Sequence, residues 1–194
     1  PVERIDVTSG SAKLISENGE VLEGEVVVLA NGIGTNALHG LPDDIPLSRP
    51  IRGVNLILDQ SPLEKPITHL IKHHRGNLCP RGDSRLIVGT TYDADETNLV
   101  ADDAVIEKLY SNAEGILPGL RQLPLLDVAC GIRVKIGDGK LLLGRSAIEP
   151  RVAFSLSHAG AGFLRAPVVA RELADYLISD KCEGFAAPFI KRSA

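Results

Sequence analysis

Two segments between positions 129 and 167 contain residues that could bind a ligand or take part in catalysis. Arg133 lies at the end of an apolar run, and a later loop with two glycines, Gly160 and Gly162, leads directly into a helical pattern. A helix N-terminus carries unpaired amide groups that attract negative charge, and glycine lets a ligand approach the backbone closely. An arginine can donate two parallel hydrogen bonds to a carboxylate, which a lysine cannot do. The spacing therefore indicates a binding site for anions.

Arg133 and His158 are the candidate catalytic residues. His158 directly precedes the glycine loop, where a histidine can be a structural hydrogen-bonding residue or an acid or base. Arg133 can form an ion pair at the surface, or it can bind a substrate carboxylate. Its run is apolar from Leu125 to Ala129, and arginine is seldom buried without a partner. The residue pattern alone leaves both alternatives open for each side chain.

Hydrophobic patterning and turn signals predict the elements that position these residues. The continuously apolar run 26–30 is typical of a strand buried on both faces of an α/β sheet. Short extended segments between 53 and 91, separated by turn residues, indicate an antiparallel sheet. A helix is expected to follow the N-cap at Asp102 and to end at Pro118, and the final helix is expected to have Pro167 in its first turn. This pattern predicts an α/β fold of two lobes.

A glycine-containing hexapeptide follows the 26–30 run and formally matches a dinucleotide-binding turn. Residues 32–37 read Gly-x-Gly-x-x-Ala, but such a turn needs a helix of several turns after it. Here Gly40 and Pro42 end any helix at once. We therefore interpret Gly32 as part of a strand end that lines a cofactor site.

The order of the motifs resembles the C-terminal part of the FAD-dependent glycine oxidase and D-amino-acid oxidase family. Segments 25–32, 46–53 and 80–89 resemble a flavin-domain strand, the entry into the substrate domain and a central hairpin of that family. The C-terminal signature consists of Gly-x-Arg at 131–133, Asp-Gly at 138–139, Leu-Gly at 143–144, x-His-x-x-x-Gly at 157–162 and Ala-Pro at 166–167.

The resemblance implies the C-terminal part of a flavin-binding α/β domain together with an antiparallel β-sheet substrate domain. It assigns residues 1–46 and 136–194 to the flavin domain and residues 47–135, with one helix, to the substrate domain. The family's first strand, its Gly-x-Gly-x-x-Gly turn and the following helix do not precede Glu25. A missing N-terminal flavin-binding half is therefore an expected partner.

The resemblance also implies an activity, a cofactor and a set of site residues. The activity is oxidation of an amine, an amino acid or a related small carboxylate by hydride transfer to FAD. Arg133 and Asn77 are implied as substrate-binding residues, Arg133 and His158 as catalytic residues, and no metal site is predicted. The implied cofactor-binding residues are Gly32, Gly131, His158, Gly160, Ala161 and Gly162.

Three departures from the family pattern leave the substrate open. Val134 stands where the family usually has a proline. Asn77 stands where glycine oxidase-like members have a tyrosine that helps bind the carboxylate, and Gly160 stands where they have a second arginine. These departures favour a larger amine, an N-methylated amino acid or a 2-hydroxy acid over a small amino acid. Two alternatives follow: an FAD-dependent 2-hydroxy-acid dehydrogenase, or a non-catalytic flavoprotein fragment that acts as a binding module.

Composition narrows the class of protein. The 194 residues are 44% hydrophobic and 24% charged, which is typical of a globular chain, and the net charge of -4 argues against a nucleic-acid partner. The 3 cysteines show no paired spacing, so free thiols and a cytoplasmic location are expected. No apolar run approaches the length needed to cross a bilayer.

Overall fold

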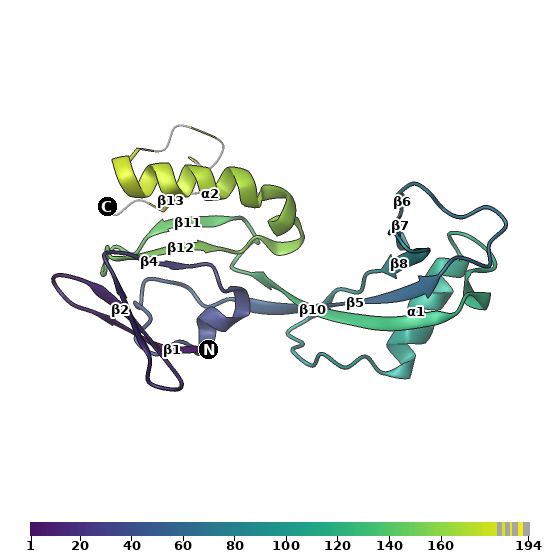
Figure 1. Cartoon of the computed structure of the whole chain (residues 1–194), viewed down its shortest axis with the longest axis horizontal. Coiled ribbons are helices and arrows are strands. Elements are labelled where there is room, and N and C mark those ends of the chain that lie inside the picture. The colour runs from purple at the N-terminus through teal and green to yellow at the C-terminus, as the bar shows by residue number, and fades with distance from the viewer. Residues whose placement is uncertain (182–183, 185–186, 188–189, 192–194) are drawn as a thin grey trace. The chain divides into compact units, whose positions relative to one another are not determined.

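The computed structural model describes residues 1–181, 184, 187 and 190–191. The chain divides into two compact units. The first comprises Pro1–Pro50 and Arg133–Ala194, and the second comprises Ile51–Ile132. The fold is mixed α/β with several sheets, as predicted (Figure 1). The assignment of residues 1–46 and 136–194 to a flavin domain and of 47–135 to a substrate domain stays a prediction.

The first unit begins with a three-stranded antiparallel sheet in the order β1-β2-β3. Gly19 closes the turn between the second and third strands with a φ of 84°, a conformation that glycine adopts without steric cost. One face of this sheet is apolar, and Ile5 and Ala12 are buried there. The strands are β1 (Val2–Val7), β2 (Ala12–Ser16) and β3 (Val21–Gly24).

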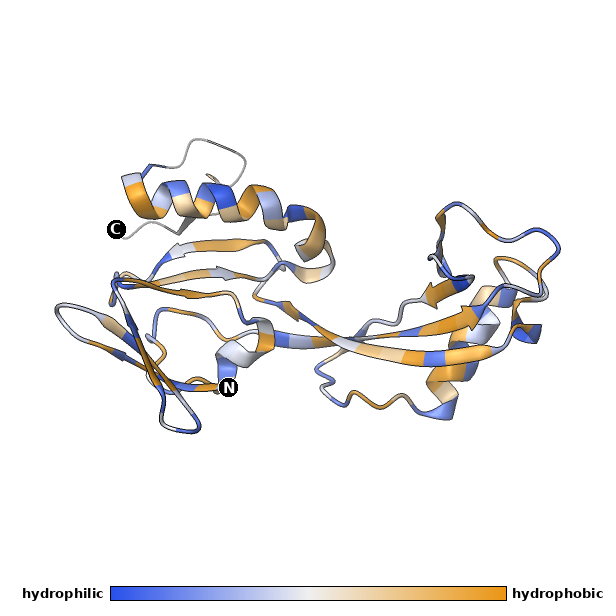
Figure 2. Ribbon diagram, in the orientation of Figure 1, coloured by the Kyte–Doolittle hydropathy of each residue, from blue (hydrophilic) through white to orange (hydrophobic). Residues whose placement is uncertain are grey.

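A second sheet of the first unit carries the candidate site. Its order is β13-β11-β12-β4, and β12 pairs antiparallel with β11 but parallel with β4. Hydrophobic residues dominate β11 and β12 (Figure 2). Val152, Phe154 and Leu156 alternate along β12 and pack in one cluster with Ile5 and Ala12. The strands are β4 (Val27–Leu29), β11 (Leu142–Arg145), β12 (Val152–Leu156) and β13 (Ile190–Lys191).

Helix α2 (Gly162–Ser179) packs against β11 through Val169 and Leu173, which form a buried cluster with Leu143. Its C-terminal end is held by Arg145, whose Nη2 donates a hydrogen bond of 2.7 Å to the Leu177 carbonyl. A cation at this position also stabilises the negative end of the helix dipole.

The start of α2 corrects the prediction that Pro167 lies in its first turn. Gly162 already has helical angles, with φ of -55° and ψ of -48°, so the helix begins inside the glycine loop and Pro167 lies in its interior. Glycine can adopt a helical conformation as readily as a loop conformation, and its presence therefore did not mark the boundary.

Strand β4 lies at the edge of the second sheet. Val27 and Leu29 are buried, but the side chain of Val28 points to the other face and the residue is 45% exposed. The prediction of a strand buried on both faces is therefore wrong at Val28, because α2 packs over β11 rather than over this strand. A short 3₁₀ helix, η1 (Gly32–Ala37), follows, and Leu38 after it is extended. This geometry agrees with the interpretation that residues 32–37 are not a nucleotide-binding turn.

The second unit is built on an antiparallel sheet in the order β10-β5-β8-β7-β6, with β9 beside β5. Helix α1 (Asp103–Glu114) packs against β7 and β8, and Asp102 caps it by accepting a hydrogen bond of 2.8 Å from the Val105 amide. The helix ends before Gly115, earlier than the predicted stop at Pro118. The strands are β5 (Arg49–Asp59), β6 (Ile71–His73), β7 (Gly76–Pro80), β8 (Arg85–Gly89), β9 (Asp93–Ala94) and β10 (Leu125–Lys135).

Candidate functional site

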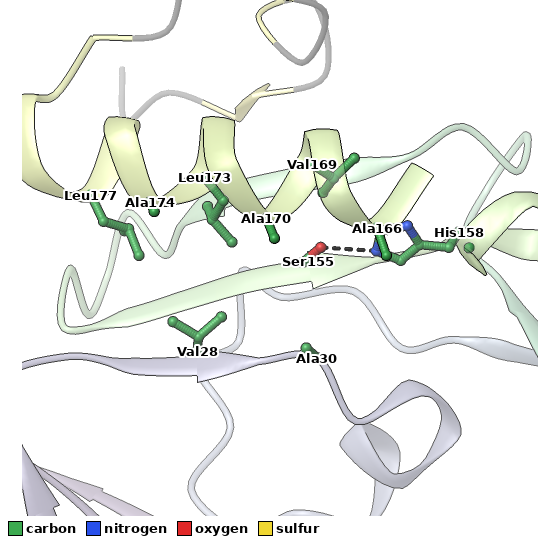
Figure 3. A pocket seen from close by; sticks show the side chains of 11 residues that line it. Val28, Ala30, Ser155, His158, Ala166, Val169, Ala170, Leu173, Ala174 and Leu177 are labelled. Atoms are coloured by element: carbon green, nitrogen blue, oxygen red, sulfur yellow. Dashed lines mark hydrogen bonds between the residues drawn. The ribbon is translucent and has the colours of Figure 1, made fainter. Parts of the chain in front are cut away.

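A pocket of about 480 Å³ lies in the first unit, between α2 and the β4–β12 side of the sheet (Figure 3). Its walls are mainly apolar, with Val28 on one side and Ala166, Ala170 and Ala174 of α2 on the other. Ser155 and His158 are the polar side chains that line it. An apolar cavity with a few convergent polar groups is the usual form of a ligand or cofactor site.

The two polar side chains of the pocket contact each other. His158 Nε2 and Ser155 Oγ are 2.8 Å apart (Figure 3). His158 Nδ1 is buried without a hydrogen-bond partner among the residues that the structure describes. Burial lowers the pKa of His158, a hydrogen bond with the Ser155 backbone opposes this shift, and the positive charge of Arg165 lowers the pKa further. The imidazole is therefore neutral at pH 7, with one ring nitrogen still able to bind a polar group.

The glycine loop connects β12 to α2 through η3 (Ala159–Ala161). The N-terminus of α2 has no side-chain cap and no acidic residue in its first turn. A Cβ atom at Gly162 would lie 3.1 Å from the His158 Cβ, so a larger residue there would require His158 to shift slightly. A Cβ atom at Gly160 would have no atom within 4 Å, which leaves that backbone open to a ligand.

The structure brings some of the predicted site residues together. His158 and Gly162 both line the pocket, and Gly160 and Ala161 lie between them in η3. Gly32 begins η1, shortly after Ala30, which also lines the pocket.

The other predicted residues lie outside the pocket. Arg133 is a half-buried residue of β10 in the first unit. Asn77 in β7 and Gly131 in β10 belong to the second unit. The roles assigned to all these residues stay predictions.

Sequence reasoning missed Ser155 and the alanines of α2. The alternation of Val152, Phe154 and Leu156 toward one face of β12 places Ser155 on the opposite face, toward α2. This period of two was visible in the sequence and could have identified Ser155 as a partner for His158. The alanines Ala166, Ala170 and Ala174 recur with helical spacing, which could have indicated a second apolar face on the helix.

In the part of the chain that the structure describes, no three histidine, cysteine, aspartate or glutamate side chains are placed to hold a metal ion. The rings of His73 and His74 lie against each other, and their centroids are 4.0 Å apart. Cys79 and Cys130 are free thiols, as predicted, while Cys182 lies outside the described residues. Within the same residues, no helix combines the length and the apolar character needed to cross a membrane.

A glycine loop that leads from a strand of a mixed sheet to an uncapped helix N-terminus defines a class of site that binds electron-rich or anionic cofactors. Residues 1–176 match the DAO family, described as FAD dependent oxidoreductase, and the chain belongs to this family. The predicted family and its cofactor, FAD, are thereby confirmed.

The chain is similar to other proteins in sequence and in fold. It is 28% identical to a glycine oxidase of Bacillus licheniformis over 183 residues, which are 93% of the chain and 48% of the relative. The structure matches a glycine oxidase of Geobacillus kaustophilus with a TM-score of 0.85 and 23% identity, over 100% of the chain and 52% of the other. It matches iminodiacetate oxidase of Chelativorans sp. BNC1 with a TM-score of 0.80 and 17% identity, over 96% of the chain and 51% of the other protein. The chain thus spans about half the length of the relatives it matches.

The residues at the pocket fit a flavin. An isoalloxazine ring is flat and mainly apolar, with polar atoms along one edge, and it gains negative charge on reduction. The uncapped start of α2 offers amide donors for such an edge, and Arg165 adds positive charge near His158. The open backbone at Gly160 and the unpartnered Nδ1 of His158 supply room and a further polar contact.

The lowered pKa of His158 predicts how the stability of the protein depends on pH. The ordinary pKa is 6.5, so in acid the unfolded chain binds this proton before the folded chain does. The contribution of His158 is fully present above about pH 6.5 and is lost as the pH falls through that value toward the lower folded-state pKa. The free energy of unfolding, measured with urea, should fall as the pH is lowered from about 7.5 to 5. We expect this fall to be smaller in His158→Gln than in the wild type. If the free energy of unfolding depends on pH in the same way in both proteins, the lowered pKa of His158 is contradicted. The pKa of His73 is also lowered, but His73 is present in both proteins and its effect cancels in the comparison.

Proposed function

We propose that the chain is the C-terminal part of an FAD-dependent oxidoreductase that oxidises an amine, an amino acid or a related small carboxylate. The observation that carries the proposal is the glycine loop at the uncapped N-terminus of α2. Membership of the DAO family supports it. The non-catalytic binding module is disfavoured, because that role would not require an open glycine loop against an uncapped helix.

The residues of the chain act on substrate and cofactor by binding and orientation. When bound, FAD accepts a hydride from the substrate carbon, so the protein does not need a nucleophile of its own. The first amides of α2 would hold the polar edge of the ring and would stabilise negative charge on it. Arg133 would bind the substrate carboxylate and orient the substrate carbon for reaction. Neutral His158 keeps its Nδ1 available at the cofactor loop.

The substrate that we favour is an amine that bears a carboxylate and is larger than glycine. Two relatives are a glycine oxidase and an iminodiacetate oxidase, and both named substrates join an amine to a carboxylate. The family pattern expects a tyrosine where Asn77 stands and an arginine where Gly160 stands, and each residue present is smaller, which supports a larger substrate. A 2-hydroxy acid is the alternative, because Arg133 would bind its carboxylate in the same way.

The partner that we propose is an N-terminal flavin-binding half, supplied by the same longer polypeptide. Strand β4 lies at the edge of a sheet and pairs in parallel with β12 on one side. Parallel strands of α/β folds are normally covered on both faces, yet Val28 is 45% exposed and faces the pocket beneath α2. A further parallel strand would pair with β4 at this edge of the sheet. We also keep the cytoplasmic location as a proposal.

A substrate panel with the full-length enzyme tests the proposed function. Under anaerobic conditions, glycine, N-methylglycine, iminodiacetate, proline and 2-hydroxy acids are added separately, and loss of flavin absorbance is followed. We expect secondary or N-methylated amino acids to bleach the flavin faster than glycine does. Bleaching by 2-hydroxy acids alone would favour the dehydrogenase alternative. An enzyme that binds FAD but is reduced by none of the amines or hydroxy acids would contradict the catalytic proposal.

A further inference from the structure

Ser157 combines an unfavourable backbone conformation with complete burial. It lies between β12 and His158, has a φ of 59° and is 0% exposed. An L-residue other than glycine, asparagine or aspartate rarely adopts this left-handed conformation, and glycine would adopt it without steric cost. Because Ser157 is fully buried, its hydroxyl needs a hydrogen-bond partner within the protein, which is a contact that glycine could not make.

That contact joins two segments of the candidate site. Ser157 Oγ accepts a hydrogen bond of 3.0 Å from the backbone amide of Ile136. Ile136 directly follows β10, the strand that carries Arg133. Ser157 itself directly precedes His158 and the glycine loop. One hydroxyl group thus connects the end of the arginine-bearing strand to the start of the loop before α2.

We propose that Ser157 is a positioning residue, which sets the spacing between the segment of Arg133 and the glycine loop. The inference rests on the proposed function, in which Arg133 holds the substrate and the loop holds the flavin. Hydride transfer is sensitive to the separation of the reacting atoms, so a shift between these two segments lowers the rate without removing any group that touches the substrate.

Two substitutions separate the hydrogen bond from the strain. Ser157→Ala removes the hydroxyl and keeps the left-handed strain, whereas Ser157→Gly removes the hydroxyl and relieves the strain. Ser84→Gly is the matched control, since Ser84 has a φ of 58° in an exposed hairpin turn, and its hydroxyl makes no hydrogen bond to any residue that the structure describes. The control measures the effect of strain relief alone.

The full-length enzyme provides the functional test. We expect Ser157→Gly to have a Tm close to the wild-type value but a kcat/KM lower by about five- to tenfold, mainly through kcat, and weaker FAD binding. Ser157→Ala should lose both stability and activity, and Ser84→Gly should leave activity unchanged. If the activity of Ser157→Gly returns to the wild-type value together with its Tm, the residue is structural only and the proposal fails.

Amide hydrogen exchange in the full-length protein supplies a readout that does not depend on catalysis. Exchange at Ile136, followed by NMR, should be faster in both Ser157 variants than in the wild type and in Ser84→Gly. Unchanged exchange at Ile136 would overturn the hydrogen bond on which the proposal rests. A full-length protein that binds no flavin would instead contradict the proposed function, while the exchange measurement would still test the contact.

Discussion

Arg133→Ala in the full-length enzyme should lower kcat/KM for a carboxylate substrate on the order of a hundredfold or more. Two charge-assisted hydrogen bonds are lost, each contributing about 1.5–3 kcal/mol, and the substrate carboxylate is left without its partner. Arg133→Lys should recover only part of the loss, because an ammonium supplies charge without the planar geometry. Steady-state kinetics with the best substrate of the panel measures both effects.

The flavin spectrum and the Tm distinguish a substrate-binding Arg133 from a structural one. Both should change little in Arg133→Ala, since the residue is assigned to the substrate rather than to the cofactor or the core. Arg171→Ala, on an exposed part of α2, is the control for loss of a surface charge. If Arg133→Ala loses flavin or unfolds while amines without a carboxylate react as before, Arg133 is structural. The carboxylate assignment would then lose its main support.

The 194-residue chain alone should bind FAD at least about a thousandfold more weakly than the full-length enzyme. Under the proposed function, the groups that bind the ADP half of FAD lie in the N-terminal half. Loss of two or three hydrogen bonds to charged groups amounts to about 4 kcal/mol or more, which corresponds to that factor. Absorbance of the purified protein and fluorescence titration with FAD measure the difference.

FMN provides the control for this prediction, because it contains the same ring without the adenosine half. The chain alone should bind FMN and FAD with affinities within about tenfold of each other, whereas the full-length enzyme should strongly prefer FAD. A stoichiometric FAD spectrum from the chain alone would show that its own residues hold the whole cofactor. The proposed division of the flavin site between two halves would then be wrong.

Local signals in the sequence predicted the elements whose ends depend on local chemistry. Asp102 caps α1 as expected, because an aspartate side chain can accept a bond from the helix amides wherever the helix packs. The turn between β7 and β8 contains Asp83 and Ser84 with positive φ, in agreement with its turn residues. The antiparallel strands of the second unit were recognised for the same reason.

The features that sequence reasoning missed depend on which elements pack together. The exposure of Val28 follows from the position of α2 over β11, which no residue near Val28 encodes. The helix start at Gly162 depends on backbone angles that glycine leaves open, so this residue type did not mark the boundary. At the site, the glycine loop was visible as a motif, but the contact of Ser155 with His158 depends on which face of β12 meets the helix.

The open edge of β4 also has a consequence for handling the protein. Strand β4 is the last strand of its sheet, and its middle residue, Val28, is exposed. The backbone of such an edge strand can pair with another chain. Phe163 and Leu164 at the start of α2 are also exposed, at 102% and 84%, and add apolar surface. The isolated chain therefore carries an aggregation hazard at the region where the flavin-binding half is proposed to dock. A charged residue at position 28 would make the isolated chain more soluble and would, by the same change, obstruct its assembly.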